Sequence, residues 1–418
     1  MSAPGAVRIH GRAAAAVHRP ESRAELAEWL RATTGAVAPV GGGTRLHLGA
    51  PLAAESYTAV DLTGLSRIVD HAVDDLTITV EAGVTLAALQ ERLAAHQQWI
   101  PLDPPRPECA TVGGLLATAA WGPLRPWGET PRRHLIGLTV LDGAGVARRA
   151  GGRVVKNVAG YDMMKLHTGA LGTLGIIVEA TFRVHPRPEQ EVLHLGCASS
   201  LDALMDLATR LTRSDLEPAV FVAMDSRHAA ELGVTPNRFM PLGIAVGFLG
   251  FREDVAWREE QLFEMATEAG VKLEHRLVDA DAAGFRARLV LPPLPGATKL
   301  RAAALPTQSA ALLQPTLVLA AELTGTQSPE MFVMYPSLGQ LRVAIPADVT
   351  LTGAHLTQVR AAVERMGGHL LVERSPAVST GEFDPWGSPG DGAPLMAGLK
   401  TALDPARRFN PGRFAGGI

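Results

Sequence analysis

The sequence predicts an α+β protein built from two domains, and three observations support this prediction. Segments with helical periodicity are mixed with strand-like segments along the whole chain. The length of 418 residues exceeds the roughly 250–300 residues at which a single hydrophobic core usually stops growing. The density of glycine falls around Pro186-Arg187-Pro188, which marks a natural break. We therefore expect a first domain over residues 1–188 and a smaller α+β cap domain over residues 189–393.

The elements of the first domain are predicted from periodicity and capping residues. Ser22 precedes an amphipathic segment, so a capped helix is expected over residues 20–34. Residues 36–40 predict a short strand that runs directly into three glycines. The other expected elements are strands over 77–83 and 176–184 and a helix over 86–93.

The second domain continues the same mixture of helices and strands. Strands are expected over residues 219–224, 243–248 and 340–345, and helices over residues 201–212, 255–269 and 356–366. The following stretch, residues 376–393, is rich in Pro, Gly and Ser and reads as a loop, and residues 394–403 predict a helix. No internal repeat is visible in the sequence.

The composition indicates a globular protein and argues against several classes. Apolar residues make up 47% of the chain and charged residues 19%, which is sufficient to build hydrophobic cores. The formal net charge of −3 gives no basic field that would attract nucleic acid. The two cysteines, Cys109 and Cys197, are far apart, so neither a disulfide framework nor a cysteine-ligated iron–sulfur cluster is expected. No apolar run suits a signal peptide or a transmembrane segment, so a cytoplasmic protein is expected.

Glycine is unusually frequent, with 43 residues, and it occurs in clusters. Four clusters lie at residues 41–43, 113–114, 151–152 and 169–175. A backbone requires glycine where φ is positive or where another group approaches the main chain closely. Any one cluster could be an ordinary hairpin turn, but together they favour a ligand that lies along several turns.

The first cluster belongs to the sequence Pro39-Val40-Gly41-Gly42-Gly43-Thr44-Arg45-Leu46. A strand that ends in three glycines can present successive backbone N–H groups as a concave site for pyrophosphate. The sequence is not a GxGxxG dinucleotide fingerprint, and no Gly-Lys-Ser/Thr follows as in a Walker loop. A glycine-rich hairpin is the structural alternative.

Two later segments combine glycine with small or polar residues. Thr111-Val112-Gly113-Gly114 leads into the small residues 117–120, which could pack against a flat ring or simply form a tight helix contact. Residues 152–166 place Lys, Asn, Tyr and Asp between glycines, ahead of a predicted strand. Composition alone does not name the ligand of these segments.

The order of these motifs resembles the FAD domain of the vanillyl-alcohol-oxidase-type flavoproteins. The resemblance rests on PVGGGT at 39–44, ATVGG at 110–114, KNVAGYD at 156–162 and GALGTLGII at 169–177. The C-terminal DPARRFNPGR at 404–413 is similar to the carboxyl end of the 2-hydroxyacid dehydrogenases of that superfamily.

Within that superfamily, the sequence is most similar to the FAD-binding E subunits of bacterial glycolate oxidase. The matching segments are residues 122–127, 152–162, 367–369 and 410–413. The resemblance implies a two-part FAD-binding domain of the vanillyl-alcohol-oxidase type, the cap domain, and a C-terminal segment, residues 394–418, that returns to the FAD domain. Because no histidine stands at Gly43 or Thr44, where covalently flavinylated members often have one, the flavin is expected to be bound non-covalently.

The resemblance also assigns the cofactor contacts. Residues 41–46 would hold the pyrophosphate through backbone amides, and residues 111–114 with Gly122 would line the ribityl and isoalloxazine side. Leu135 and Ile177 would face the adenine half. The expected FAD-binding residues are Pro39, Gly41, Gly42, Gly43, Thr44, Arg45, Leu46, Pro104, Thr111, Val112, Gly113, Gly114, Gly122, Leu135, Asn157, Gly160, Tyr161, Asp162, Ile177 and Asn410.

The sequence departs from complete 2-hydroxyacid dehydrogenases in the residues that carry their chemistry. It lacks the histidine motifs that supply a metal and a base, and Leu171 replaces their acidic residue. His369 and Glu373 would lie four residues apart on a strand, too far to share a metal, so no metal site is expected. No catalytic base stands out. Candidate cations for a substrate carboxylate are Arg286, Arg288 and Arg374, each of which could equally be a surface arginine.

These features predict an FAD-binding subunit of a glycolate-oxidase-like complex, which oxidises a small 2-hydroxy acid such as glycolate to glyoxylate. A homologous FAD-linked 2-hydroxyacid dehydrogenase subunit and an iron–sulfur subunit would be its partners, and the latter would receive the electrons. The protein would be cytoplasmic, peripheral to the inner membrane through its partners. The alternative is a self-sufficient FAD-dependent 2-hydroxyacid dehydrogenase or oxidase. A degenerate scaffold without flavin is a third alternative, which the intact glycine clusters oppose.

Overall fold

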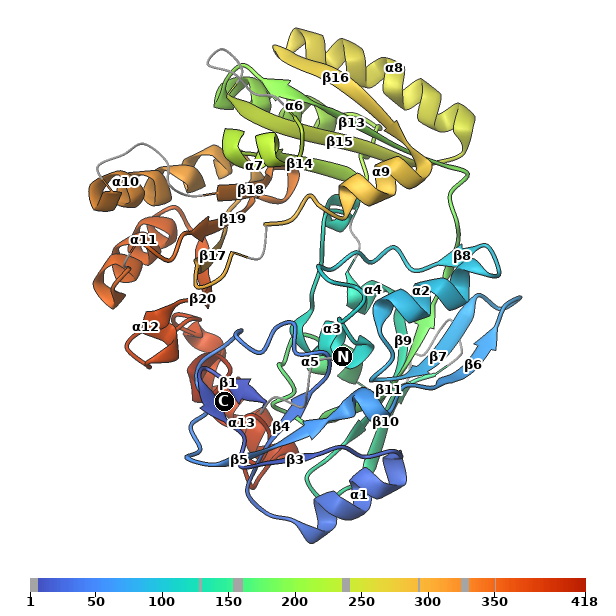
Figure 1. The fold of residues 1–418 in the computed structure, drawn as a ribbon, viewed down its shortest axis with the longest axis vertical. Coiled ribbons are helices and arrows are strands. Elements are labelled where there is room, and N and C mark those ends of the chain that lie inside the picture. Colours follow the sequence, from blue (N-terminus) through green and yellow to red (C-terminus); the bar gives the residue numbers. More distant parts are fainter. Residues whose placement is uncertain are drawn as a thin grey trace. The chain divides into compact units, whose positions relative to one another are not determined.

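The structure, a computed structural model, describes residues 7–127, 130–152, 161–234, 241–291, 294–324, 331–349 and 351–418. The chain divides into two compact units, which are described separately (Figure 1). The first unit comprises Met1–Trp121, Thr130–Arg187 and Ser379–Ile418, and the second comprises Gly122–Glu129 and Pro188–Val378. Helices and strands are mixed in both units, so the predicted α+β class is confirmed.

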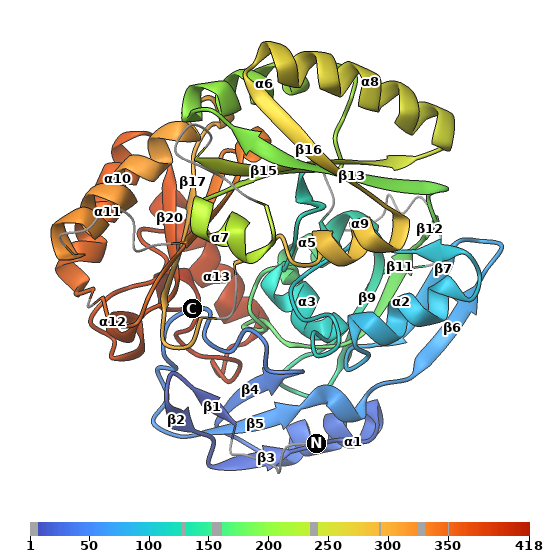
Figure 2. The ribbon, with the colours of Figure 1, turned by 45° about the horizontal axis from the view of Figure 1, so that its top comes forward.

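The first unit begins with a small parallel sheet and one helix. Its strand order is β3 (Ala16–His18), β5 (Tyr57–Asp61) and β4 (Ala36–Val40). Helix α1 (Arg23–Ala32) lies beside these strands (Figure 2) and starts where the Ser22 side chain accepts a hydrogen bond from the Glu25 amide at 3.1 Å. Its apolar face buries Leu26 and Leu30, so the helix stabilises the sheet that ends in the first glycine cluster.

The larger sheet of this unit is antiparallel and five-stranded. Its strand order is β10 (Ala147–Gly151), β9 (Leu135–Leu141), β11 (Ile176–Arg183), β7 (Thr77–Glu81) and β6 (Ile68–Ala72). One face buries an apolar core together with α2 (Leu86–Ala94) and α3 (Val112–Thr118). The other face packs Leu141, Ile176 and Val178 against α1 and Phe409. Both faces are therefore buried, which accounts for the apolar character of β9 and β11.

Short elements complete the first unit. They are β1 (Arg8–Ile9), β2 (Arg12–Ala13), β8 (Gln98–Trp99), α4 (Pro131–His134), α5 (Met163–His167), β12 (His185–Pro186) and α13 (Ala393–Leu403). The C-terminal segment runs alongside β4, because Val37 donates its amide to Arg408 O at 2.7 Å and accepts from the Asn410 amide at 2.9 Å. Residues about 370 positions apart thus share one edge of the small sheet.

The second unit contains an eight-stranded antiparallel sheet. Its strand order is β16 (Val271–Val278), β13 (Gln190–Ala198), β15 (Leu242–Gly250), β14 (Val220–Met224), β18 (Met331–Tyr335), β19 (Gln340–Ile345), β17 (Thr298–Ala303) and β20 (His369–Arg374). The remaining helices are α6 (Leu201–Arg213), α7 (Ser226–Glu231), α8 (Arg252–Glu268), α9 (Asp279–Arg286), α10 (Leu313–Thr324), α11 (Gly353–Arg365) and α12 (Pro376–Ser379).

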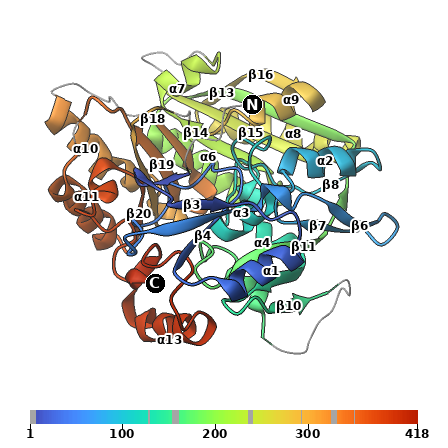
Figure 3. The same cartoon turned by 60° about the horizontal axis from the view of Figure 1, so that its bottom comes forward.

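This sheet is a repeat of one topology. Each half has the order strand, helix, strand, strand, helix, strand, with α7 inserted between the two middle strands of the first half. In each half the fourth strand pairs with the first, which pairs with the third, which pairs with the second. The two second strands, β14 and β18, pair with each other and join the halves. Helix α6 packs next to α8 (Figure 2) and α10 next to α11 (Figure 3). No internal repeat was expected from the sequence, because different residues specify the same topology in the two halves.

Neither compact unit is a single continuous stretch of the sequence. One boundary falls between Arg187 and Pro188, and another between Val378 and Ser379, ahead of residue 394. Residues Gly122–Glu129 cluster with the second unit, which nothing in the sequence indicates. No helix within the described ranges is long and apolar enough to cross a membrane.

Candidate functional site

The glycine loop that follows β4 packs tightly against the segment before α3. A Cβ atom on Gly42 would lie 1.7 Å from the carbonyl oxygen of Cys109, and one on Gly41 would lie 2.0 Å from Thr111 Oγ1. Any side chain would push the two segments apart, so glycine is required at both positions. The glycines thus bring two of the predicted motifs into direct contact.

Backbone donors gather in this loop. The N–H groups of Gly42, Gly43 and Thr44 donate to no acceptor among the residues that the structure describes. Gly43 has a φ of 70°, a left-handed conformation that glycine adopts without strain. Successive N–H groups in such a turn form a site for an anion.

Two adjoining cavities lie beside the loop. The first is lined by Pro39, Gly41, Gly42, Gly43, Thr44, Arg45, Leu46, Thr111, Gly114, Ala117, Thr118, Leu171, Asn410 and Arg413. The second is lined by Pro39, Val40, Gly41, Leu62, Ala82, Thr111, Gly113, Gly114, Ala117, Leu171, Gly172, Gly175 and Ile177. The first cavity carries the polar groups and two cations, whereas the second is nearly all apolar. Together they offer an anion site next to a site for an apolar ring.

Asn410 reaches the first cavity from the C-terminal segment. Its side chain is 2% exposed, and its Nδ2 donates to Leu171 O at 2.6 Å. Its Oδ1 is buried and has no hydrogen-bond partner in the described part of the chain. A buried acceptor without a donor is costly, so this atom is suited to accept a hydrogen bond from a ligand.

The structure thus brings together twelve of the predicted cofactor residues around the two cavities, namely Pro39, Gly41, Gly42, Gly43, Thr44, Arg45, Leu46, Thr111, Gly113, Gly114, Ile177 and Asn410. The residues that line the cavities without having been predicted individually are Val40, Leu62, Ala82, Ala117, Thr118, Leu171, Gly172, Gly175 and Arg413. Residues 117–118 and the glycines at 172 and 175 belong to segments that the sequence already associates with a ligand, whereas Val40, Leu62 and Ala82 are apolar and carry no chemical signal of their own. Arg413 alone could have been selected, because it closes the Asn-Pro-Gly-Arg motif.

The other predicted residues lie elsewhere. Pro104, Val112 and Leu135 are buried and line neither cavity. Tyr161 is 93% exposed, and Asp162 caps α5 and forms an ion pair with Arg132.

Three further predicted residues cannot be compared with the two cavities. Asn157 and Gly160 lie outside the described residues, and Gly122 belongs to the second compact unit. The roles expected for all of these residues stay predictions.

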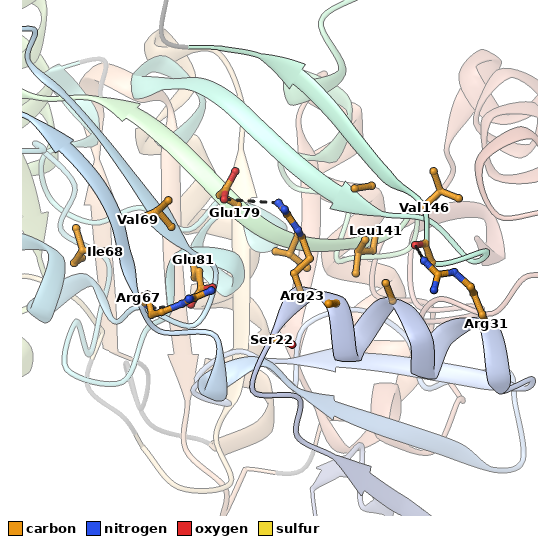
Figure 4. A pocket seen from close by; sticks show the side chains of 15 residues that line it. Ser22, Arg23, Arg31, Arg67, Ile68, Val69, Glu81, Leu141, Val146 and Glu179 are labelled. Carbon is orange, nitrogen blue, oxygen red and sulfur yellow. Dashed lines mark hydrogen bonds and ion pairs between the residues drawn. The ribbon is translucent and has the colours of Figure 1, made fainter.

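A wider pocket of about 730 Å³ lies between α1 and the opposite face of the large sheet (Figure 4). Its charged side chains satisfy one another. Arg67 donates to Glu81 Oε1 at 2.7 Å, and Arg23 lies 3.9 Å from Glu179. Arg31 donates to Gly145 O at 3.4 Å. Size alone therefore does not make this pocket a ligand site, since it lacks the unsatisfied polar atoms of the glycine-loop cavity.

Two of the three candidate cations predicted in the second unit, Arg286 and Arg288, have protein partners. Arg286 is 8% exposed, and its Nε and Nη2 donate to the carboxylate of Glu191 at 2.6 and 3.3 Å. Arg288 donates to Glu231 O at 3.3 Å. Arg374 lies half-buried opposite Lys299 in the register of β17 and β20. The charge of Arg286 is thus neutralised inside the fold.

Another pair of arginines stands out in the same unit. Arg301 and Arg342 lie directly opposite each other on β17 and β19. Arg301 Nε is 3.6 Å from Glu373 Oε1, and burial lowers the pKa of Arg301 below its usual range. Like charges directly opposite each other on a sheet are unfavourable. The pair thus places two guanidinium groups and the Glu373 carboxylate side by side in this sheet.

Comparison with known proteins bears on the part of the chain that contains the glycine loop. Residues 14–151 match the family profile described as the FAD binding domain. This part of the chain has the fold of an FAD-binding domain. The cofactor is therefore FAD, and the residues around the two cavities fit it, because the loop offers amide donors, Asn410 offers a buried acceptor, and the second cavity is apolar. FAD would be held by residues 41–46, Thr111 and Asn410.

Curated relatives match over the same region. The chain is 34% identical over 169 residues to glycolate oxidase subunit GlcE of Escherichia coli (strain K12), which covers 40% of this chain and 47% of that protein. It is 37% identical over 182 residues to D-2-hydroxyglutarate dehydrogenase of Xanthomonas citri pv. viticola, which covers 43% of this chain and 38% of that protein. The matches thus span less than half the length of these relatives.

Solved structures show that the fold extends over the rest of the chain. An alkyldihydroxyacetonephosphate synthase superposes with a TM-score of 0.72 at 16% identity, over 95% of this chain and 77% of that one. The chain therefore shares its fold with that synthase, and with the match to the FAD binding domain this confirms the expected fold class. Within the described residues, no group of three or more His, Cys, Asp or Glu side chains could hold a metal ion.

Proposed function

We propose that the chain is the FAD-binding subunit of a glycolate-oxidase-like complex that oxidises a small 2-hydroxy acid. The observation that carries the proposal is the convergence of the glycine loop, Thr111 and Asn410 on one cavity within the FAD-binding domain. When bound, FAD supplies a two-electron acceptor for the oxidation of an α-carbon hydroxyl group to a carbonyl group. The names of the relatives, a glycolate oxidase subunit and a D-2-hydroxyglutarate dehydrogenase, support an oxidoreductase acting on 2-hydroxy acids.

The substrate carboxylate needs a cation, for which the sequence offers Arg286, Arg288 and Arg374. Arg286 is the weakest of these candidates, because Glu191 already occupies its guanidinium group with a bidentate ion pair.

Partners complete the proposal. A homologous FAD-linked 2-hydroxyacid dehydrogenase subunit would join this chain, and an iron–sulfur subunit would take the electrons. The alternative is a self-sufficient 2-hydroxyacid dehydrogenase, which the match to a D-lactate dehydrogenase of Arabidopsis thaliana, 30% identical over 181 residues, supports.

Anaerobic titration separates these functions. The purified chain loaded with FAD is mixed with glycolate or D-lactate, first alone and then with the co-expressed partner subunits, and the flavin absorption is followed. Bleaching that requires the partners supports the subunit, and bleaching of the isolated chain supports the self-sufficient enzyme. A flavin that stays oxidised with every 2-hydroxy acid in both settings would contradict both functions, while leaving FAD binding intact.

A further inference from the structure

Arg413 is a buried cation that lines the cavity beside the glycine loop. Its side chain is 4% exposed. It forms no ion pair with a carboxylate among the described residues, and its Nε is buried without a hydrogen-bond partner. Burial lowers the pKa of Arg413 to about 10, so the guanidinium stays charged at neutral pH. An uncompensated buried charge is costly, which calls for a compensating anion.

Hydrogen bonds to residues 46–50 fix the position of Arg413. Its Nη2 donates to Leu46 O at 2.8 Å and to Leu48 O at 2.6 Å, and its own carbonyl oxygen accepts from the Ala50 amide at 3.0 Å. The guanidinium is thus tied by two carbonyl groups to the loop whose N–H groups lack acceptors. These contacts use Nη2 alone and leave Nε and Nη1 unused.

Other groups near Arg413 do not neutralise it. The Tyr57 hydroxyl donates to Arg12 O at 3.0 Å, and burial raises the pKa of Tyr57, so this phenol is neutral at pH 7. Burial and the charge of Arg413 lower the pKa of His10 to about 4, so this imidazole is neutral as well. Neither side chain supplies a negative charge.

We infer that Arg413 is the counter-charge for the pyrophosphate of the bound dinucleotide. Its guanidinium, the amides of Gly42 and Gly43, and Asn410 Oδ1 act on one ligand from two ends of the chain. The pyrophosphate provides the anion that the buried cation lacks, and the cation adds a charge-assisted interaction that backbone amides alone do not give. This inference rests on the FAD site and is independent of the proposed 2-hydroxyacid chemistry.

Ligands with and without the pyrophosphate test the inference. Dissociation constants of FAD and riboflavin are measured by fluorescence for the wild-type chain and for Arg413→Gln and Arg413→Lys. We expect Arg413→Gln to weaken FAD binding about tenfold to a hundredfold, which corresponds to the roughly 1.5–3 kcal/mol of a hydrogen bond to a charged group. Riboflavin binding should stay within about twofold, and Arg413→Lys should retain part of the FAD affinity.

Arg12→Gln is the matched control. Arg12 Nη1 also donates to backbone carbonyls next to the loop, at Leu52 (3.3 Å) and Ala54, but the residue is exposed and lines neither cavity. This variant should not change the ratio of FAD to riboflavin affinity. If Arg413→Gln weakens the binding of FAD and of riboflavin equally, Arg413 has only a structural role and the inference is wrong. An unchanged FAD affinity would also overturn the inference.

A measurement on the wild-type chain covers the case in which Arg413→Gln does not fold. ADP contains a pyrophosphate and adenosine does not, so ADP should raise the melting temperature of the flavin-free chain more than adenosine at equal concentration. Equal effects of the two ligands would contradict the inference without any substitution.

Discussion

Lys400 and Asp404 form an ion pair of 2.7 Å between Nζ and Oδ2 at the end of α13, and each side chain is only 1% exposed. Lys400 Nζ also donates to Thr173 O at 2.7 Å and to Phe409 O at 2.9 Å. Asp404 accepts from the amides of Arg408 and Phe409. The pair therefore fastens the C-terminal segment to the glycine-rich loop beside the FAD site, and it sets the position of Asn410.

Removing one member of this pair should destabilise the first unit strongly. Lys400→Met leaves the Asp404 carboxylate buried without its cation, which typically costs about 3–5 kcal/mol. We expect this loss in the free energy of unfolding, measured by urea titration, together with weaker FAD binding. The double variant Lys400→Met, Asp404→Leu should recover much of the stability, and a single variant as stable as the wild type would refute a structural role for the pair.

Gly42 should tolerate no side chain. In Gly42→Ala, the Cβ would overlap the Cys109 carbonyl oxygen, from which it is 1.7 Å away, so the loop and the α3 segment must separate. We expect FAD retention after gel filtration to be lost while the second unit stays folded by circular dichroism. Gly284→Ala, where a Cβ meets nothing within 4 Å, is the control and should bind FAD normally. Full FAD retention in Gly42→Ala would show that the close contact is dispensable.

Arg286 should prove to be a stability residue. In Arg286→Met, the Glu191 carboxylate loses its bidentate partner, and we expect the free energy of unfolding of the second unit to fall by about 3–5 kcal/mol. The combination with Glu191→Leu should restore most of that loss. If Arg286→Met instead leaves stability unchanged and raises only the KM for a 2-hydroxy acid, the residue contacts the substrate as the sequence suggested.

Acid should destabilise the first unit through His167. Burial lowers the pKa of His167 from its ordinary value of 6.5 to about 4. Between pH 6.5 and pH 4 the unfolded chain therefore binds a proton that the folded chain does not. Stability is therefore retained above pH 6.5 and decreases as the pH falls toward 4, by an amount on the order of 2–3 kcal/mol.

Urea unfolding at pH 7 and pH 5 checks this expectation. His167→Leu should lose less stability between the two pH values than the wild type, whereas His275→Leu, at an exposed site, should behave like the wild type. An identical pH response in His167→Leu would assign the acid sensitivity to other groups.

Local patterns were sufficient to predict the class and many elements. The cap at Ser22 and the strand into Gly41 formed where periodicity and capping residues place them, because these signals act over a few neighbouring residues. The exposure of individual side chains was not predicted by such local signals. Tyr161 carries a family motif and yet is 93% exposed, since exposure depends on packing that no local pattern encodes.

The sequence by itself determined the α+β class, the glycine loop and the kind of ligand that such a loop binds. The spacing of glycine residues is a local signal, and it indicates directly which backbone segments a phosphate can approach. Only the tertiary structure decided that Arg413 lines the same cavity as Gly42, some 370 residues earlier in the chain. It also decided that Arg286 is neutralised by Glu191 and that the eight-stranded sheet of the second unit repeats one topology. Burial and charge compensation arise from contacts between distant segments, so they become visible only when the chain is folded.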